Sequence, residues 1–287
     1  MNNLSKLILG TVQFGLDYGI NNSSGKVPAK EVTQILDYAK SVGINTLDTA
    51  VAYGNAEEKI GGYHLNNNPF IVNTKFDKRN DIDWEDSLRN SLTKLKIPKV
   101  NTVMFHSFGA YYQQKENLPN IISKGKGNYF NNIGISVYTN EELKLLLNDQ
   151  YIEVIQLPFN LLDNERLRGK FLKQLKEKGK TIHVRSVFLQ GLFYKNTDGL
   201  SQRLPALIPF LTMLQKITHA ENISMNALAL QYAYSKEYID GILIGVDSKL
   251  QLEENVYALN QKIDMKLFSE IDKIKVSNTD LLNPAKW

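Results

Sequence analysis

Short runs of apolar and β-branched residues alternate along this chain with longer segments in which apolar residues recur every three or four positions. The short runs are typical of buried strands, and the longer segments are typical of amphipathic helices. The predicted strands cover residues 6–10, 45–49, 70–75, 102–106, 132–136, 153–158, 181–186 and 241–245. The predicted helices cover residues 29–43, 84–96, 140–149, 166–178, 207–220, 225–234, 250–259 and 265–274, and "NAEEKIG" (55–61) starts a further helix.

This alternation continues through the chain without an interrupting linker. Eight strand–helix units in roughly 250 residues have the size and rhythm of a (β/α)8 barrel. An open, doubly wound sheet shows the same alternation, but it usually carries a G-x-G-x-x-G turn after its first strand. Here the first strand continues as "GTVQFGLDYG" (10–19), which lacks that spacing. We therefore predict an α/β fold, with a single TIM-barrel domain over residues 1–287.

Composition narrows the classes of function. The chain has 287 residues, of which 43% are hydrophobic, and a net charge of +4 with lysines interspersed among acids. That charge distribution does not predict a nucleic-acid surface, and no cysteine is present to form disulfides, thiolate metal sites or cysteine nucleophiles. No metal site is predicted. The apolar run near the N-terminus is too short for a secretory signal, and no stretch of about 18 apolar residues predicts a membrane span. We expect a cytoplasmic protein that acts on a small molecule, and the sequence leaves its oligomeric state open.

Polar residues at the ends of the predicted strands are the candidates for chemistry, because a barrel of this kind has its active site at the carboxyl ends of its strands. Asp48 ends the second strand, and Tyr53 lies in the loop that follows. Lys75 ends the third strand and His106 the fourth. Each has an ordinary structural explanation when taken singly, such as a helix cap or a core aromatic. Together they come from three consecutive strands and should meet at one rim.

These four side chains make chemical sense as a set. A phenol is a weak acid with a pKa near ~10, and a neighbouring ammonium ion favours its ionised form. Asp48 would keep Lys75 charged and in place, while His106 would orient a substrate oxygen by a hydrogen bond. Tyr53 would then donate a proton to a carbonyl oxygen. In a competing hypothesis, Lys75 is a Schiff-base nucleophile of the kind that barrel aldolases use.

At this point the sequence resembles the aldo-keto reductases. The stretch "DTAVAYGNAEEKIG" (48–61) matches their D-T-A-x-x-Y-G-x-x-E-x-x-[IL]-G signature, and "VNTK" and "VMFH" resemble the strands that deliver a lysine and a histidine. Further similar segments are "GTVQFG", "GISVY", "QLPFNLLD", "RSVFLQGLF" and "LIGVDSKLQLEENV", so the resemblance spans nearly the whole chain. It implies reduction of an aldehyde or ketone to an alcohol, with Tyr53 as the general acid and Asp48, Lys75 and His106 as its partners.

The resemblance also implies a nicotinamide cofactor that lies extended across the barrel mouth without a Rossmann fold. The residues expected to bind it are Gly10, Thr11, Ser136, Gln156, Arg185, Ser186, Gly191, Gly245, Asp247, Ser248, Gln251, Glu254 and Asn255. The family favours NADPH. Asp247, however, stands where related bacterial members often carry arginine, and a carboxylate near the ribose would repel a 2′-phosphate. NADH is therefore the alternative, unless Lys249 offsets that charge.

Two departures from the family pattern affect the nicotinamide end. Val137 replaces an asparagine that would contact the carboxamide, and Arg185 replaces an aromatic residue that would stack on the ring. Both lend slight support to a function of another class, a barrel that binds the nucleotide as a redox sensor or regulator with little turnover. The complete set of four polar residues argues against that alternative.

The substrate is expected to lie under two long loops, residues 106–120 and 186–205. We predict that Phe108, Tyr111 and the C-terminal Trp287 contact it. Aromatic side chains with scattered polar groups suit a sugar or a sugar-derived carbonyl compound. The same aromatics would otherwise simply pack within their own loops.

Overall fold

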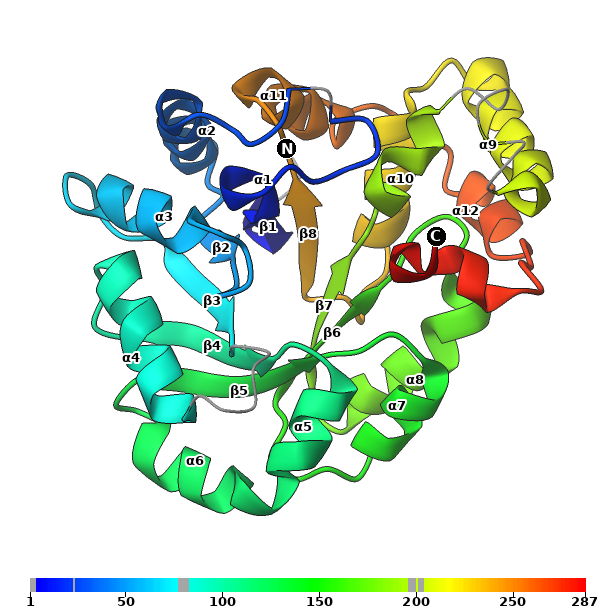
Figure 1. Cartoon of the computed structure of the whole chain (residues 1–287). Helices are drawn as coiled ribbons and strands as arrows, with labels where there is room; N and C mark the ends of the chain where they lie inside the picture. The colour runs from blue at the N-terminus through cyan, green and yellow to red at the C-terminus, as the bar shows by residue number, and fades with distance from the viewer. Residues whose placement is uncertain (1–3, 23, 77–82, 196–199, 201–203) are drawn as a thin grey trace.

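A computed structural model describes residues 4–22, 24–76, 83–195, 200 and 204–287. In this part of the chain, eight parallel strands follow one another around a closed barrel, and β8 pairs with β1 (Figure 1). The strands are β1 (Leu7–Gly10), β2 (Thr46–Asp48), β3 (Ile71–Lys75), β4 (Val100–Phe105), β5 (Phe130–Ser136), β6 (Val154–Pro158), β7 (Thr181–Arg185) and β8 (Gly241–Gly245). Each overlaps a predicted run within two residues at either end, so the predicted TIM barrel is confirmed.

Helices surround the barrel (Figure 1). They are α1 (Val12–Gly15), α2 (Ala29–Ser41), α3 (Ala56–His64), α4 (Trp84–Leu95), α5 (Phe108–Gln114), α6 (Leu118–Gly125), α7 (Asn140–Leu146), α8 (Glu165–Glu177), α9 (Ile208–Ala220), α10 (Met225–Tyr234), α11 (Lys249–Ala258) and α12 (Lys266–Ile271). Short 3-10 segments cover Leu4–Lys6, Lys115–Asn117, Leu189–Tyr194, Pro205–Leu207, Thr279–Leu282 and Pro284–Lys286.

The ends of most predicted helices agree with the structure within a few residues. The predicted helix over 140–149 is shorter, because α7 ends at Leu146. The segment 106–120 was predicted as a loop, and it is instead largely helical, since it holds α5 and the start of α6. Of the second predicted loop, residues 196–199 and 201–203 lie outside the described part of the chain, and the preceding segment forms the 3-10 turn Leu189–Tyr194.

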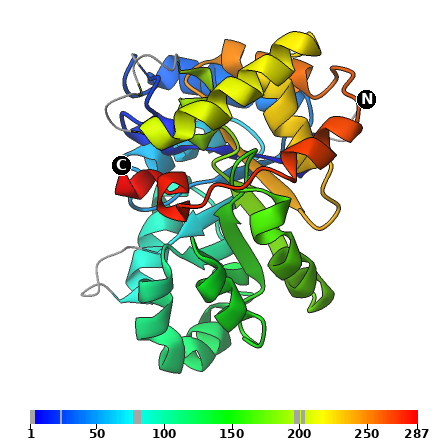
Figure 2. The same ribbon diagram turned by 90° about the vertical axis from the view of Figure 1, so that its right-hand side faces the viewer.

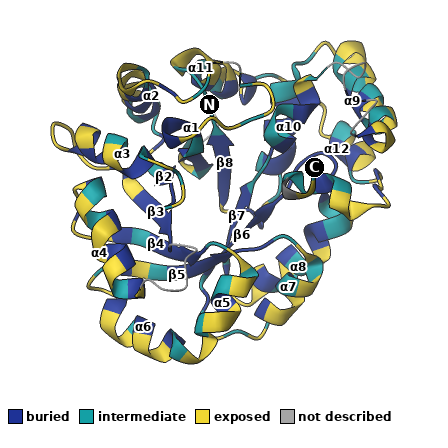
Figure 3. Cartoon of the chain, viewed as in Figure 1, coloured by how far each residue is buried: buried dark blue, intermediate teal, exposed yellow. Residues whose placement is uncertain are grey.

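Burial explains why these segments form these elements. All five residues of β6 are buried, as expected of a strand covered on both faces. In α2, the buried residues Val32, Ile35, Leu36 and Ala39 repeat at helical spacing and form one face. Figure 3 shows the same division, with buried strands at the centre and exposed residues on the outer sides of the helices. Each large apolar side chain buried in this way contributes roughly 1.5–3 kcal/mol to the free energy of unfolding.

The barrel brings the carboxyl ends of its strands to one face. Gly10 of β1 is in register with Asp48 of β2, and Ser136 of β5 is in register with Gln156 of β6. The C-terminal segment after α12, red in Figure 2, runs along the side of the barrel toward this face. Among the described residues, no helix is both long enough and apolar enough to cross a membrane.

Candidate active site

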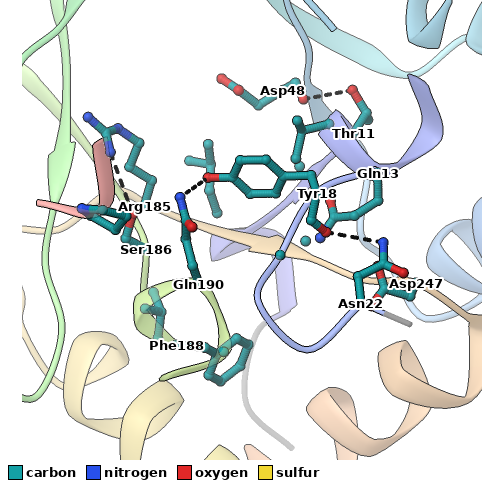
Figure 4. A pocket seen from close by; sticks show the side chains of 18 of the residues that line it. Thr11, Gln13, Tyr18, Asn22, Asp48, Arg185, Ser186, Phe188, Gln190 and Asp247 are labelled. Carbon is teal, nitrogen blue, oxygen red and sulfur yellow. Dashed lines mark hydrogen bonds between the residues drawn. The ribbon is translucent and has the colours of Figure 1, made fainter. Parts of the chain in front are cut away.

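A cavity of about 850 Å³ opens at the carboxyl ends of the strands (Figure 4). The four candidate catalytic side chains, Asp48, Tyr53, Lys75 and His106, all line it. So do twelve of the thirteen residues predicted to bind a cofactor: Gly10, Thr11, Ser136, Gln156, Arg185, Ser186, Gly191, Gly245, Asp247, Gln251, Glu254 and Asn255. Ser248, the remaining one, is not among the lining residues, and its hydroxyl instead caps α11 by accepting a hydrogen bond from the backbone N–H of Gln251.

A buried ion pair lies at the centre of the site. Lys75 Nζ pairs with Asp48 Oδ1 and donates a second hydrogen bond, of 3.0 Å, to the carbonyl of Thr49. The other carboxylate oxygen, Asp48 Oδ2, accepts a hydrogen bond of 2.8 Å from Gln156 Nε2. Burial by itself lowers the pKa of Lys75, but interactions with Asp48 and Tyr53 outweigh burial and raise that pKa. Lys75 is therefore a fixed ammonium ion at neutral pH.

Tyr53 and His106 lie against this ion pair. Lys75 Nζ is 5.3 Å from the centroid of the Tyr53 ring. The rings of Tyr53 and His106 meet edge to face, with centroids 6.0 Å apart and an interplanar angle of 85°. Side chains from β2, β3 and the two loops after β2 and β4 thus converge on one point of the rim.

Two glycines hold the backbone of Tyr53 in place. A Cβ on Gly15, at the end of α1, would lie 1.7 Å from the carbonyl oxygen of Tyr53, and a Cβ on Gly54 would lie 2.4 Å from the carbonyl oxygen of Gly15. Gly54 also has a φ of +56°, which is costly for residues other than glycine. Lys59 fastens α1 by donating to the carbonyl of Phe14 at 2.7 Å. Sequence reasoning missed this contact, although Gly15 and Gly54 both stand in the quoted family motifs.

Two loops meet across the mouth of the cavity. The hydroxyl of Tyr18, which follows β1, accepts a hydrogen bond of 2.7 Å from Gln190 Nε2, which follows β7 (Figure 4). Asn21 Nδ2 donates to the carbonyl of Gly191 at 2.6 Å. Further lining residues, outside the predicted catalytic and cofactor sets, are Val12, Gln13, Leu16, Gly19, Asn22, Ala52, Tyr138, Val187, Phe188, Tyr194, Asn226, Leu243 and Pro284. Val187, Phe188 and Tyr194 lie in the loop 186–205 that was expected to cover the substrate, whereas the other residues of this set have no distinctive spacing in the sequence.

The predicted substrate contacts are not at this cavity. Tyr111 is only 3% exposed, packs edge-on against Phe105 at 5.8 Å, and its hydroxyl donates a hydrogen bond to Asp149 Oδ2. Phe108 packs on Tyr111, with centroids 5.4 Å apart, and the indole of Trp287 donates to the carbonyl of Leu281 at 3.0 Å. None of the three predicted side chains lines the cavity. The prediction for Tyr111 is wrong, because helix formation in α5 buries its ring in the core.

Asp247 marks the acidic end of the cavity. Its Oδ1 atom is buried and has no hydrogen-bond partner among the described residues, and its backbone N–H donates to Gln251 Oε1 at 2.8 Å. Burial raises the pKa of Asp247, and a hydrogen bond with Gln251 opposes that rise. Lys249 does not offset the charge, because its Nζ pairs with Glu253 at 3.1 Å and the residue is not among those lining the cavity.

A parallel eight-stranded barrel with an acid, a phenol, an ammonium ion and an imidazole at its carboxyl rim defines an oxidoreductase of the aldo-keto reductase type. The model of the Aldo/keto reductase family matches residues 6–276, so the chain belongs to this family. Membership makes it an oxidoreductase of carbonyl compounds in general terms.

Solved structures share the fold. An aldo-keto reductase from Bacillus halodurans, in its holo form, is 20% identical with a TM-score of 0.73, and the match covers 94% of this chain and 92% of that one. A protein from Pseudomonas aeruginosa assigned to the aldo-keto reductases is 20% identical with a TM-score of 0.65, covering 89% of this chain and 90% of that one. The comparison with curated proteins found no match.

Proposed function

We propose that this protein reduces an aldehyde or ketone to an alcohol with a nicotinamide dinucleotide, and that Tyr53 is the general acid. The observation that carries the proposal is the buried Asp48–Lys75 ion pair beneath the Tyr53 ring, with His106 at the edge of that ring. A proton donor next to a fixed positive charge is suited to a reaction in which negative charge develops on a carbonyl oxygen.

The cavity residues fit a nicotinamide dinucleotide, which supplies the hydride when bound. Ser136 and Gln156 are neighbours in register and present a hydroxyl and an amide side by side, as a carboxamide requires. At the other end, the buried Asp247 Oδ1 lacks a donor that a ribose hydroxyl would provide. Ser136 and Gln156 would hold the nicotinamide, and Asp247, Gln251 and Asn255 would hold the adenosine.

Each of the four central residues has one role in this mechanism. His106 orients the substrate by a hydrogen bond to the carbonyl oxygen. Tyr53 would donate its proton to that oxygen when the carbonyl group is reduced. Lys75 stabilises the resulting phenolate by its charge, and Asp48 keeps Lys75 charged and in position.

The alternative use of Lys75 as a Schiff-base nucleophile finds no support in this geometry. A nucleophilic amine must lose its proton, and the ion pair with Asp48 raises the pKa of Lys75 and opposes that loss. Borohydride treatment in the presence of an aldehyde should therefore give no covalent adduct on Lys75, as read by peptide mass spectrometry.

The charges at the adenosine end bear on the choice of dinucleotide. Family resemblance implies NADPH, whose 2′-phosphate needs a cation. Among the described residues that line the cavity, the cations are Lys75 on β3 and Arg185 on β7, whereas Asp247 lies in the loop after β8. We infer that NADH binds better than NADPH.

The test of the proposed mechanism is Tyr53→Phe. This change should lower kcat/KM for carbonyl reduction about 100-fold or more, because the transition state loses its proton donor. The dissociation constant of the dinucleotide, measured by quenching of protein fluorescence, should stay nearly unchanged. Tyr112→Phe is the control, since Tyr112 is 69% exposed and lies outside the cavity.

Two outcomes would contradict the proposal. Normal turnover by Tyr53→Phe would show that Tyr53 is not the general acid. Tight dinucleotide binding without turnover of any carbonyl compound would favour the sensor function instead.

A further inference from the structure

A glutamate of the signature motif, Glu57, is buried outside the cavity and has no part in the proposed chemistry. It is the second residue of α3 and is only 3% exposed. The described residues offer it no ion-pair partner, since the nearby Lys94 pairs with Glu58 at 3.4 Å. Burial of a carboxyl group without a cation is costly, and it raises the pKa of Glu57. Because glutamate is seldom buried in this way, the contact that Glu57 does make is informative.

That contact is a hydrogen bond to the strand that carries Lys75. Thr74 Oγ1, on a residue only 1% exposed, donates to Glu57 Oε1 at 2.7 Å. Thr74 directly precedes Lys75 on β3, and successive side chains of a strand point to opposite faces. Thr74 therefore faces α3, whereas Lys75 faces the cavity. The hydrogen bond ties the first turn of α3 to the strand that delivers the ammonium ion.

The same turn of α3 holds the backbone of Tyr53. The N–H of Ala56, the first residue of α3, donates to the carbonyl of Tyr53 at 3.0 Å. The loop before Tyr53 also reaches β3 directly, because the N–H of Val51 donates to the carbonyl of Lys75. At 3.4 Å, however, that bond is longer than a usual hydrogen bond and is weak. The firmer connection between Tyr53 and Lys75 therefore runs through α3 and the Glu57 side chain.

We propose that Glu57 is a positioning residue, which holds α3 against β3 and thereby sets the place of the Tyr53 phenol relative to the Lys75 ammonium group. The inference rests on the proposed function, since this placement affects turnover only if Tyr53 is the general acid. Neither Glu57 nor Thr74 lines the cavity, so both act through their elements and touch neither substrate nor dinucleotide. A misplacement of about 1 Å can lower the rate of such a reaction about 100-fold.

The experiment measures kcat, KM and the dissociation constant of the dinucleotide in variants that break or keep this hydrogen bond. Glu57→Met and Thr74→Val break it, and each should lower kcat about tenfold or more, while KM and the dissociation constant change by less than about threefold. Glu57→Gln keeps an acceptor oxygen and Thr74→Ser keeps a hydroxyl, so both should retain most of kcat. Glu58→Met is the matched control, because Glu58 is the next residue, its side chain is 53% exposed and it lies outside the cavity.

A double variant that combines Glu57→Met with Thr74→Val separates positioning from stability. Each single change leaves a buried polar group without its partner and should lower the free energy of unfolding, measured with urea. The double change replaces both partners by apolar groups and should recover much of that loss. If Glu57 positions Tyr53, kcat of the double variant stays as low as in the single variants. If kcat recovers together with stability, Glu57 only stabilises the fold and the inference is wrong.

If no carbonyl compound is turned over, the proposed function fails, and hydrogen exchange still decides whether Glu57 holds the Tyr53 turn. The backbone N–H groups of Val51, Tyr53 and Ala56 are all hydrogen-bonded. Glu57→Met should speed amide exchange over residues 49–56 but not in the other strands of the barrel, and Glu58→Met should leave it unchanged. Equal exchange in the two variants, or faster exchange throughout the chain, contradicts the inference. Where Tyr53→Phe does abolish turnover, a wild-type kcat in Glu57→Met contradicts it as well.

Discussion

Asp247 places a half-buried carboxylate at one end of the cavity, and its buried Oδ1 atom has no hydrogen-bond partner among the described residues. Asp247→Arg should therefore lower the ratio of the dissociation constants for NADPH and NADH by about tenfold or more, because a repulsive charge becomes an attractive one. Fluorescence titration with each dinucleotide measures that ratio without turnover. Glu177→Arg makes the same change of charge at an exposed position of α8 and should leave the ratio unchanged. If Asp247→Arg leaves the ratio of the two dissociation constants unchanged, Asp247 does not determine the choice of dinucleotide.

Tyr53 shows how neighbours decide what a side chain can do. The chain contains 14 tyrosines, and Tyr111 and Tyr53 both follow predicted strands. Tyr111 donates to Asp149 and is buried in the core, whereas Tyr53 lies over the ammonium group of Lys75 at the cavity. The signature motif distinguished Tyr53 from the others, and nothing comparable marked Tyr111 as a core residue.

At the scale of elements, α3 packs against α4 through a glycine. A Cβ on Gly61 would lie 1.9 Å from the carbonyl oxygen of Lys94, whereas a Cβ on Gly62 would meet no atom within 4 Å. Gly61→Ala should lower the free energy of unfolding by roughly 1–3 kcal/mol, because the two helices must separate. Gly62→Ala should raise it by roughly 0.5–1 kcal/mol, because alanine favours the helix.

Urea unfolding of both variants checks this prediction. Gly61 and Gly62 are adjacent in one helix, and both variants add the same methyl group. Opposite changes in the free energy of unfolding would therefore come from the contact between α3 and α4. Equal effects of the two substitutions would show that the α3–α4 contact does not constrain α3.

At the scale of the whole molecule, a buried histidine makes stability depend on pH. His64 Nδ1 contacts the carbonyl of Leu95 at 2.8 Å, and His64 Nε2 accepts a hydrogen bond of 3.2 Å from the backbone N–H of Phe70. Burial lowers the pKa of His64, the hydrogen bond to Leu95 raises it, and Lys40 lowers it further. Protonation would replace the acceptor at Nε2 with a second donor.

The direction of the pH dependence follows from that lowered pKa. As pH falls through about 6.5, the unfolded chain binds a proton at this residue before the folded chain does, so stability decreases. His183, also buried with a lowered pKa, acts in the same direction. The free energy of unfolding of the wild-type protein should decrease from pH 7.5 to 5.5. The His64→Gln variant should be less stable than the wild type at pH 7.5, but its free energy of unfolding should decrease less over the same pH range. Exposed His219→Gln should keep the wild-type slope, and a wild-type slope in His64→Gln would contradict the prediction.

The alternation of short apolar runs with helical periodicity was sufficient to predict the eight strands and most helices. Strands buried on both faces leave a continuous apolar run, and this signal depends only on neighbours along the chain. The segment 108–114, "FGAYYQQ", lacks a clear apolar period and was taken for a loop, so α5 was missed. The error passed to the substrate site, because Tyr111 packs against Phe105 in the core and its hydroxyl donates to Asp149, on a distant part of the chain.

The sequence by itself determined the order of strands, the barrel and the four polar residues at its rim, because these depend on periodicity and on a motif within single βα units. Only the tertiary structure decided that Gly15 supports the Tyr53 turn and that the Arg185 guanidinium rests on the Tyr138 ring. Such contacts join residues from different elements. The pattern of a sequence specifies which face of an element is buried, but it does not specify which side chain lies opposite.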